Sequence, residues 1–268
     1  MARYQLTLAY DGTDFFGSQR QANRRTVQGE LEKALCKLGW TGPSVIVAGR
    51  TDTGVHATGQ VAALDLDWSH SDEDLVRALN AALPADMAVH QARMVHAKFH
   101  PRFDASSRRY RYKSFCQPLR HPLRERFAWR IWPAISGEAL AATARLFLGT
   151  HDFSAFGSPT TPRGGTVRTV MKAEWTQTEE DGTWHFEVQA DAFLYRMVRR
   201  LVFVQVAVAQ GKASAEVIAR SLAKQLPAEA RSETRRRGAV ATLPAGLAPA
   251  HGLTLVEVAY AERESMVQ

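Results

Sequence analysis

Cysteine is scarce in this sequence, with two residues, Cys36 and Cys116, among 268. Cys36 falls in a helical pattern and Cys116 at the end of a strand-like run, and neither has a second cysteine nearby. Disulfide-stabilised small domains and zinc sites of cysteine pairs both need several closely spaced cysteines. The sequence therefore predicts two reduced thiols and no metal site built on them.

Long apolar runs are absent as well. A membrane-spanning helix needs about 20 consecutive apolar residues, and no stretch of this sequence has that character. The first ten residues, MARYQLTLAY, contain too few apolar residues for a secretory signal. We therefore expect a cytoplasmic protein that does not associate with a membrane.

Basic residues outnumber acidic ones, with 34 Lys and Arg against 27 Asp and Glu. The net charge of +7 favours a polyanionic partner. Runs of like charge are usually solvated faces, but here their number predicts a surface that contacts the phosphates of structured RNA. The basic residues in question form three clusters: Arg102, Arg108, Arg109, Arg111 and Lys113; Arg120, Arg124, Arg126 and Arg130; and Arg235, Arg236 and Arg237.

Hydrophobic periodicity predicts more strands than helices, several of them in adjacent hairpins, and so an α+β fold with a largely antiparallel sheet. A weak match between GTDFFGSQ and GTHDFSAFGS indicates two similar halves, predicted as domains 1–104 and 105–268. Residues 149–158 are expected to form a loop and residues 231–252 an extended surface segment. The predicted strands are 4–10, 44–49, 60–67, 87–95, 108–115, 166–178, 183–191 and 253–260; the predicted helices are 27–38, with Thr26 as N-cap, 71–83, with a capping box at Ser71, 137–147, 197–211 and 214–223.

The segment GRTDTGVHATGQ, which begins at Gly49, contains three glycines. Gly49 and Gly54 have the spacing of a phosphate-binding loop, but Val55 and His56 occupy the positions that need Lys and Ser or Thr. The dinucleotide spacing G-x-G-x-x-G is also absent. Two interpretations remain: a glycine-rich turn in which Asp52 bonds its own backbone, or a catalytic loop between two strands.

The chain as a whole resembles the TruA family of tRNA pseudouridine synthases. GRTDTGVHA resembles the family signature that holds its catalytic aspartate, with threonine where alanine is common. AYDGTDFFGSQRQ with TVQGELEKAL, FHPRFDASSRRYRY, GTHDFSAF and AFLYRMVRRLV resemble further blocks in the family's order. The resemblance implies two α+β halves joined into an extended central sheet flanked by helices, with a catalytic cleft between the halves.

The resemblance also implies roles for individual residues. Asp52 would be the catalytic nucleophile, and Arg199 would be the cation that pairs with it. Tyr110 would stack on the target base, and Arg50 and His56 would bind the substrate nucleotide. The residues themselves leave three uses of the Asp52 carboxylate open: attack on ribose C1′, addition to the base, or removal of a ribose proton.

Alternation along the strand 108–115 places Tyr110 and Tyr112 on one face and Arg109 and Arg111 on the other. A core role for both tyrosines therefore stays open. His96 and His100, four residues apart, could suggest a metal pair, but Pro101 interrupts any helix there. The sequence predicts no metal site.

The implied reaction converts uridine to pseudouridine at positions 38, 39 and 40 of the tRNA anticodon stem-loop. It neither oxidises nor hydrolyses, so we expect no cofactor and no metal. A uridine in a stem must leave the stack to react, which an aromatic ring that receives the base would assist. The family resemblance also implies a homodimer. The alternatives are a non-catalytic RNA-binding protein of the same fold and a phosphate-loop hydrolase.

Overall fold

The computed structural model describes residues 1–161, 164–223 and 242–261 of the chain. These residues form two compact units. Unit 1 contains Met1–Arg109 together with the chain from Leu253 onward, and unit 2 contains Tyr110–Gly252. The division falls inside strand β5 (Ala105–Cys116), between Arg109 and Tyr110. The C-terminal strand thus belongs to the N-terminal unit, although the single boundary predicted at residue 104 would have assigned it to the second domain.

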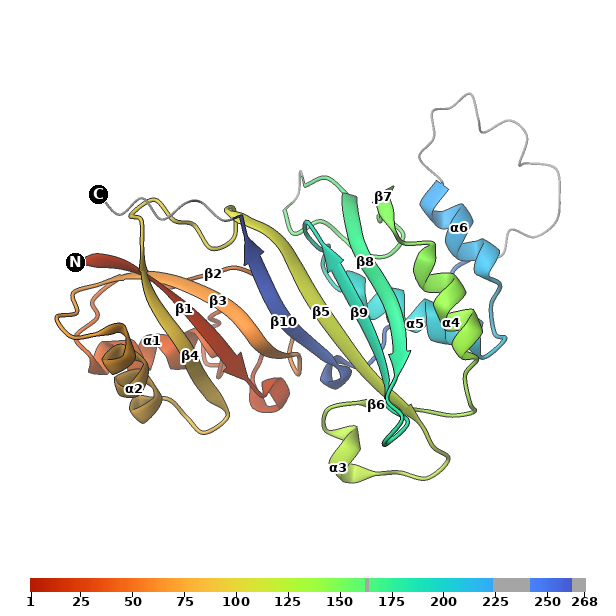
Figure 1. Ribbon diagram of the computed structural model, residues 1–268, viewed down its shortest axis with the longest axis horizontal. Coiled ribbons are helices and arrows are strands. Elements are labelled where there is room, and N and C mark those ends of the chain that lie inside the picture. Colours follow the sequence, from red (N-terminus) through yellow and green to blue (C-terminus); the bar gives the residue numbers. More distant parts are fainter. Residues whose placement is uncertain (162–163, 224–241, 262–268) are drawn as a thin grey trace. The chain divides into compact units, whose positions relative to one another are not determined.

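Unit 1 is built on a mixed sheet (Figure 1) in which the strands follow the order β4-β1-β3-β10, with β2 on β3. Strand β3 pairs antiparallel with β1 and β2 and parallel with β10. Tyr4, Leu6 and Leu8 of β1 are buried, as the alternation of the sequence predicts. The strands are β1 (Ala2–Tyr10), β2 (Ile46–Val47), β3 (His56–Leu66), β4 (Met87–Val95) and β10 (Leu253–Tyr260).

Two helices of unit 1, α1 (Val27–Lys37) and α2 (Asp72–Ala82), contact each other, and α2 packs on β4 (Figure 1). Both begin at the predicted caps: the Thr26 hydroxyl accepts a hydrogen bond from Gly29 N, and Ser71 forms a complete capping box with Asp74. A short 3-10 helix, η1 (Gly12–Asp14), follows β1.

The strands of unit 2 follow the order β5-β9-β8-β7, with β6 on β5. β8 pairs antiparallel with β7 and β9, whereas β5 and β6 are parallel. Gly182, at φ 64°, lies in the turn between β8 and β9, where the Asp-Gly pair predicts a hairpin. The remaining strands are β6 (Trp129–Ile131), β7 (Gly149–Asp152), β8 (Val167–Gln177) and β9 (Trp184–Ala190).

The core of unit 2 lies around α5 (Met197–Ala209), whose apolar side chains are mostly buried. α4 packs on both α5 and β8, and α6 packs on α5 and β7. The other helices of this unit are α3 (Pro122–Glu125), α4 (Gly137–Arg145), α6 (Ala215–Ala223) and the 3-10 helix η4 (Ala250–Gly252).

The predicted α+β class is confirmed, with ten strands and six α-helices in the described parts of the chain. The loop predicted at 149–158 is wrong for its first four residues, which form β7. These residues have no strand periodicity of their own and become a strand by pairing with β8, where Thr150 and Thr169 hydroxyls hydrogen-bond at 2.9 Å. Much of the surface segment predicted at 231–252 lies outside the described residues.

Candidate active site

The glycine-rich motif forms a loop of unit 1, between β2 and the start of β3. Asp52 is half-buried and Arg50 is exposed. Val55 N donates a hydrogen bond to the Asp52 carbonyl at 3.1 Å, which closes a turn, and Gly54 stands in that turn at φ 79°. Residues with a side chain rarely adopt this left-handed backbone conformation, so the motif needs glycine here. The turn places Asp52 immediately before a rigid central strand.

His56, the first residue of β3, is buried, with 5% of its surface exposed. Its Nδ1 accepts a hydrogen bond from Gly12 N at 2.9 Å, and an Asp11 carboxylate oxygen lies 3.1 Å from the same nitrogen. The Gly12 amide always carries its proton, so Nδ1 acts as the acceptor in this hydrogen bond. His56 therefore ties the loop that contains Asp52 to η1.

Gly12 contacts the loop a second time, because its carbonyl accepts a hydrogen bond from Gly54 N at 3.2 Å. The two segments approach so closely that a Cβ added at Gly12 would lie 2.0 Å from the Val55 carbonyl oxygen. Only glycine fits between η1 and the loop that contains Asp52. The loop is thus held by backbone packing on one side.

Buried hydroxyl groups hold Thr51, the residue before Asp52. Its Oγ1 hydrogen-bonds the Tyr10 hydroxyl at 2.9 Å, and its N donates to Ser18 Oγ at 2.8 Å. Gln60, fully buried in β3, donates to the Gly49 carbonyl at 2.8 Å and accepts from Gly49 N at 3.2 Å. Two residues that precede Asp52, Gly49 and Thr51, are thereby fixed by neutral groups.

Tyr110 is the first residue of unit 2 and is 8% exposed. Its ring meets Phe193 edge-on, with centroids 5.1 Å apart and planes at 86°. An aromatic ring supported by a second ring is held firmly in place.

Tyr112 differs from Tyr110 although both side chains are on one face of β5. Tyr112 is fully buried, and its hydroxyl donates to the Pro249 carbonyl at 2.9 Å. Burial raises the pKa of Tyr112 well above its ordinary value, against the opposing effect of the Arg199 charge. Its hydroxyl is thus used within the core of unit 2, and Tyr112 is a core residue.

Arg199 lies in the first turn of α5 and is half-buried. Its Nε donates to the Ala248 carbonyl at 2.8 Å, and its own carbonyl accepts from Ala248 N at 3.2 Å. Arg200 beside it donates to the Gly246 carbonyl at 2.8 Å, and burial lowers the pKa of Arg200. The segment around Ala248 therefore orients both guanidinium groups.

Some members of the predicted basic clusters form ion pairs with acidic side chains. On β5, Arg109 pairs with Glu257 at 2.8 Å and Arg111 with Glu187 at 2.5 Å. In the second cluster, Arg124 pairs with Asp181, and Arg120 and Arg130 pair with Glu125. The third cluster, Arg235 to Arg237, lies outside the described residues. Phosphate contact by these clusters stays a prediction.

Within residues 1–161, 164–223 and 242–261, no group of three or more His, Cys, Asp and Glu side chains is arranged to hold a metal ion. His96 and His100 therefore belong to no such group. In the same part of the chain, no helix combines the length and the apolar character that crossing a membrane requires.

The sequence prediction missed the residues that hold the loop, namely Ser18, Gln60 and Gly12. Gln60, the polar last residue of the motif, stands directly before an apolar stretch of β3, and this was the one signal that could have indicated its role. Ser18 lies 33 positions from Thr51, so nothing local connects them. Long-range partners of a loop become visible only in the folded chain.

Comparison with known proteins places these features in a family. A sequence model described as tRNA pseudouridine synthase matches residues 7–104 and 143–261. The chain is 43% identical to tRNA pseudouridine synthase A of Solidesulfovibrio magneticus, over 97% of this chain and 92% of the relative. It is 39% identical to the protein of that name from Shouchella clausii (98% and 95%) and 36% identical to that from Geobacter sp. strain M21 (98% and 100%).

Proposed function

This chain belongs to the tRNA pseudouridine synthase family, and from that premise we propose that it isomerises uridine to pseudouridine in the anticodon stem-loop of tRNA, with Asp52 as the catalytic residue. The observation that supports Asp52 is its position in a loop whose neighbouring residues are fixed by Tyr10, Ser18 and Gln60. Such fixed surroundings hold a reacting group in one geometry.

The reaction breaks the bond between ribose C1′ and N1, turns the uracil and joins C1′ to C5. C5 loses a proton and N1 gains one, so the atoms balance and the product is an isomer. The chemistry needs a carboxylate held against the nucleotide, and the half-buried Asp52 is the one we propose. Attack on C1′ is the role we propose for it, in accord with the family resemblance.

The other site residues receive roles that match their surroundings. Exposed Arg50 would contact the flipped-out nucleotide, and Tyr110, supported by Phe193, would stack on its base. Arg199 would be the cation that stabilises the carboxylate. His56 was predicted to bind substrate; its burial and its bond to Gly12 support a positioning role, and direct contact with the nucleotide stays a prediction.

The substitution Asp52→Asn tests the assignment, because it keeps the shape and removes the charge. We expect it to abolish pseudouridine formation in tRNA while tRNA affinity stays within a few-fold of wild type. Asp67→Asn, at a highly exposed carboxylate of the same unit, is the matched control and should stay active. An active Asp52→Asn would refute the role of Asp52, and an inactive wild type would refute the proposed function.

Tyr110 is tested by comparing two replacements. Tyr110→Phe keeps a ring and should retain most activity, whereas Tyr110→Ala should lose about 1–3 kcal/mol of base stacking, a drop of roughly 5- to 150-fold in kcat/KM. Similar losses in both variants would assign the effect to the hydroxyl group instead.

We also propose a homodimer in the cytoplasm. Several large apolar side chains between β5 and α4 are exposed, and a concentration of this kind is typical of protein interfaces; they are Leu119, Leu123, Phe127 and Trp132. The free thiols Cys36 and Cys116 and a tRNA substrate support the cytoplasmic location. Light scattering at micromolar concentration should give twice the chain mass, and a monomer would contradict the dimer.

A further inference from the structure

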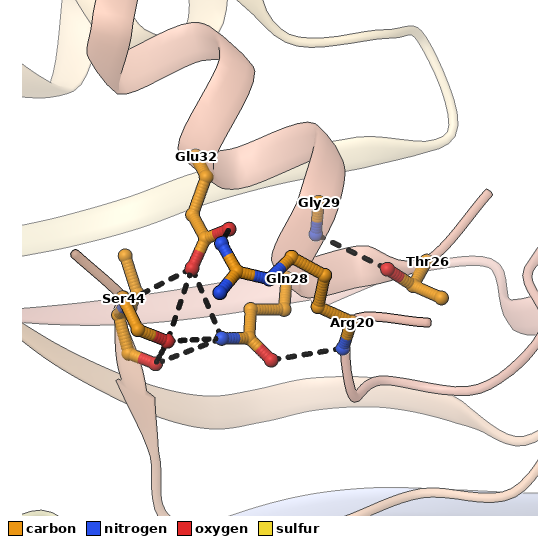
Figure 2. Close-up of polar contacts among 7 residues, drawn as sticks. Arg20, Thr26, Gln28, Gly29, Glu32 and Ser44 are labelled. Atoms are coloured by element: carbon orange, nitrogen blue, oxygen red, sulfur yellow. Dashed lines mark hydrogen bonds and ion pairs between the residues drawn. The ribbon is translucent and has the colours of Figure 1, made fainter. Parts of the chain in front are cut away.

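A buried carboxylate on α1 connects three segments around the catalytic loop (Figure 2). The Glu32 side chain is 8% exposed. Its Oε1 accepts hydrogen bonds from Gln28 Nε2 and Val45 N, both at 3.0 Å, and from Ser44 Oγ at 3.3 Å. Its Oε2 accepts from Arg20 at 2.8 Å. A buried charge needs this many partners to be tolerated.

Gln28, also on α1, makes further hydrogen bonds to Arg20 and Ser44, two of the residues that Glu32 binds. Its side-chain oxygen accepts a hydrogen bond from Arg20 N at 2.9 Å, and its Nε2 also donates to Ser44 Oγ at 2.8 Å (Figure 2). Both the backbone and the guanidinium of Arg20 are therefore held by two side chains of one helix. These hydrogen bonds restrict the conformation of the Arg20 side chain.

This network is linked directly to the catalytic loop. Ser18, two residues before Arg20, exchanges hydrogen bonds with Thr51: Ser18 N donates to the Thr51 carbonyl at 3.1 Å, and Ser18 Oγ accepts from Thr51 N. Val45, which Glu32 also holds, leads into β2 and then into the loop. Arg20 thus has a fixed position relative to Asp52.

Arg20 is nevertheless an exposed residue, with 55% of its side chain accessible. The whole segment from Gln19 to Arg24 is exposed, and Arg24 lies over the exposed ring of Phe16 at 4.5 Å. A guanidinium has five N–H donors. When a buried carboxylate binds one edge of a guanidinium group, the N–H groups that stay accessible are oriented in advance to bind an anion. This orientation lowers the entropy cost of binding.

We propose that Arg20 binds a backbone phosphate of the tRNA beside the catalytic loop, and that Glu32 is the positioning residue that orients it. This inference rests on the proposed tRNA substrate. It assigns a phosphate contact to a residue outside the three basic clusters, and Arg20 is more exposed than Arg109 and Arg111, which also pair with carboxylates.

The test measures tRNA affinity as a function of salt for Arg20→Gln and for Lys33→Gln. Lys33 is an exposed residue of α1 and loses the same charge without belonging to the network. We expect Arg20→Gln to weaken tRNA binding by about tenfold and to reduce the slope of log K against log salt by about one. Lys33→Gln should change neither, and Arg20→Lys, which keeps the charge, should recover the slope.

Glu32→Gln tests the positioning role. It should raise KM by about threefold at unchanged kcat, and the double variant with Arg20→Gln should bind tRNA no more weakly than Arg20→Gln alone. If Arg20 serves only as a counterion, Arg20→Gln lowers the melting temperature while the salt slope equals that of Lys33→Gln, and the proposal is overturned. Wild type that makes no pseudouridine would instead refute the proposed function.

Discussion

The loop of unit 1 that contains Asp52 and the beginning of α5 in unit 2 are built from opposite kinds of groups. Neutral side chains and backbone amides hold the loop, through Tyr10, Ser18 and Gln60. At the beginning of α5, arginines donate to backbone carbonyls, as Arg199 does to Ala248 and Arg200 to Gly246.

The difference follows from what each region has to present. Charged neighbours would compensate the charge of a carboxylate that the loop presents. Neutral hydrogen bonds fix the loop without adding a charge beside that carboxylate. A cation at the N-terminus of a helix interacts unfavourably with the helix dipole. Arg196 adds to this cost, because it is the N-cap of α5 at φ 62° and has no capping hydrogen bond. Local strain of this kind is typical of functional sites.

Gly12→Ala should have the largest effect on the loop. The added Cβ would lie 2.0 Å from the Val55 carbonyl oxygen, so the backbone must separate and the loop must shift. We expect a loss of about 3 kcal/mol or more in the free energy of unfolding, measured in urea, and an almost inactive enzyme. Gly165→Ala, at a position with open space, is the control. Equal behaviour of the two variants would show that the loop tolerates displacement.

Gln60→Leu should rank second. It leaves the Gly49 amide and carbonyl without their buried partner, at a cost of about 2–3 kcal/mol. The same urea titration measures this, and kcat should fall because the loop is less fixed. Thr58→Ala, at an exposed position of β3, should be nearly neutral. A stable and fully active Gln60→Leu would contradict the idea that neutral bonds hold the loop.

Arg196→Gly should change stability in the opposite direction. Glycine adopts positive φ without the steric penalty, so the free energy of unfolding should rise by about 1 kcal/mol. Arg196→Ala removes the charge but keeps the penalty and should gain less. If glycine gives no gain over alanine, the left-handed conformation carries no cost at this helix start.

Glu187→Gln should have the smallest of these effects, and its difference in stability from wild type should be present at neutral pH and disappear in acid. Burial raises the pKa of Glu187, but hydrogen bonds from Arg111 and Lys172 outweigh it and lower this pKa from 4.5 to about 2. The ionised carboxylate therefore stabilises unit 2 above about pH 4.5, and this contribution is lost as the pH falls toward 2. Wild type should lose stability more steeply than Glu187→Gln across that range. Parallel curves from urea titrations at several pH values would contradict this.

Elements with local signals were predicted well from the sequence. Thr26 and Ser71 begin their helices because a capping hydroxyl bonds an amide three residues away, and Asp-Gly turns the β8–β9 hairpin for the same local reason. The position of Asp52 before β3 also follows from a motif within one short segment. Such interactions need no distant residue, so they can be recognised in the chain itself.

By itself, then, the sequence determined the helix starts, the strand periodicity, the family signature and the candidate aspartate. The tertiary structure alone decided that β10 pairs with β3, that Arg109 and Arg111 are neutralised by Glu257 and Glu187, and that Glu32 is buried beneath Arg20. The physical reason is sequence distance. A partner that lies tens of residues away leaves no periodic or local trace, and a charge looks the same in a sequence whether it faces water or a carboxylate.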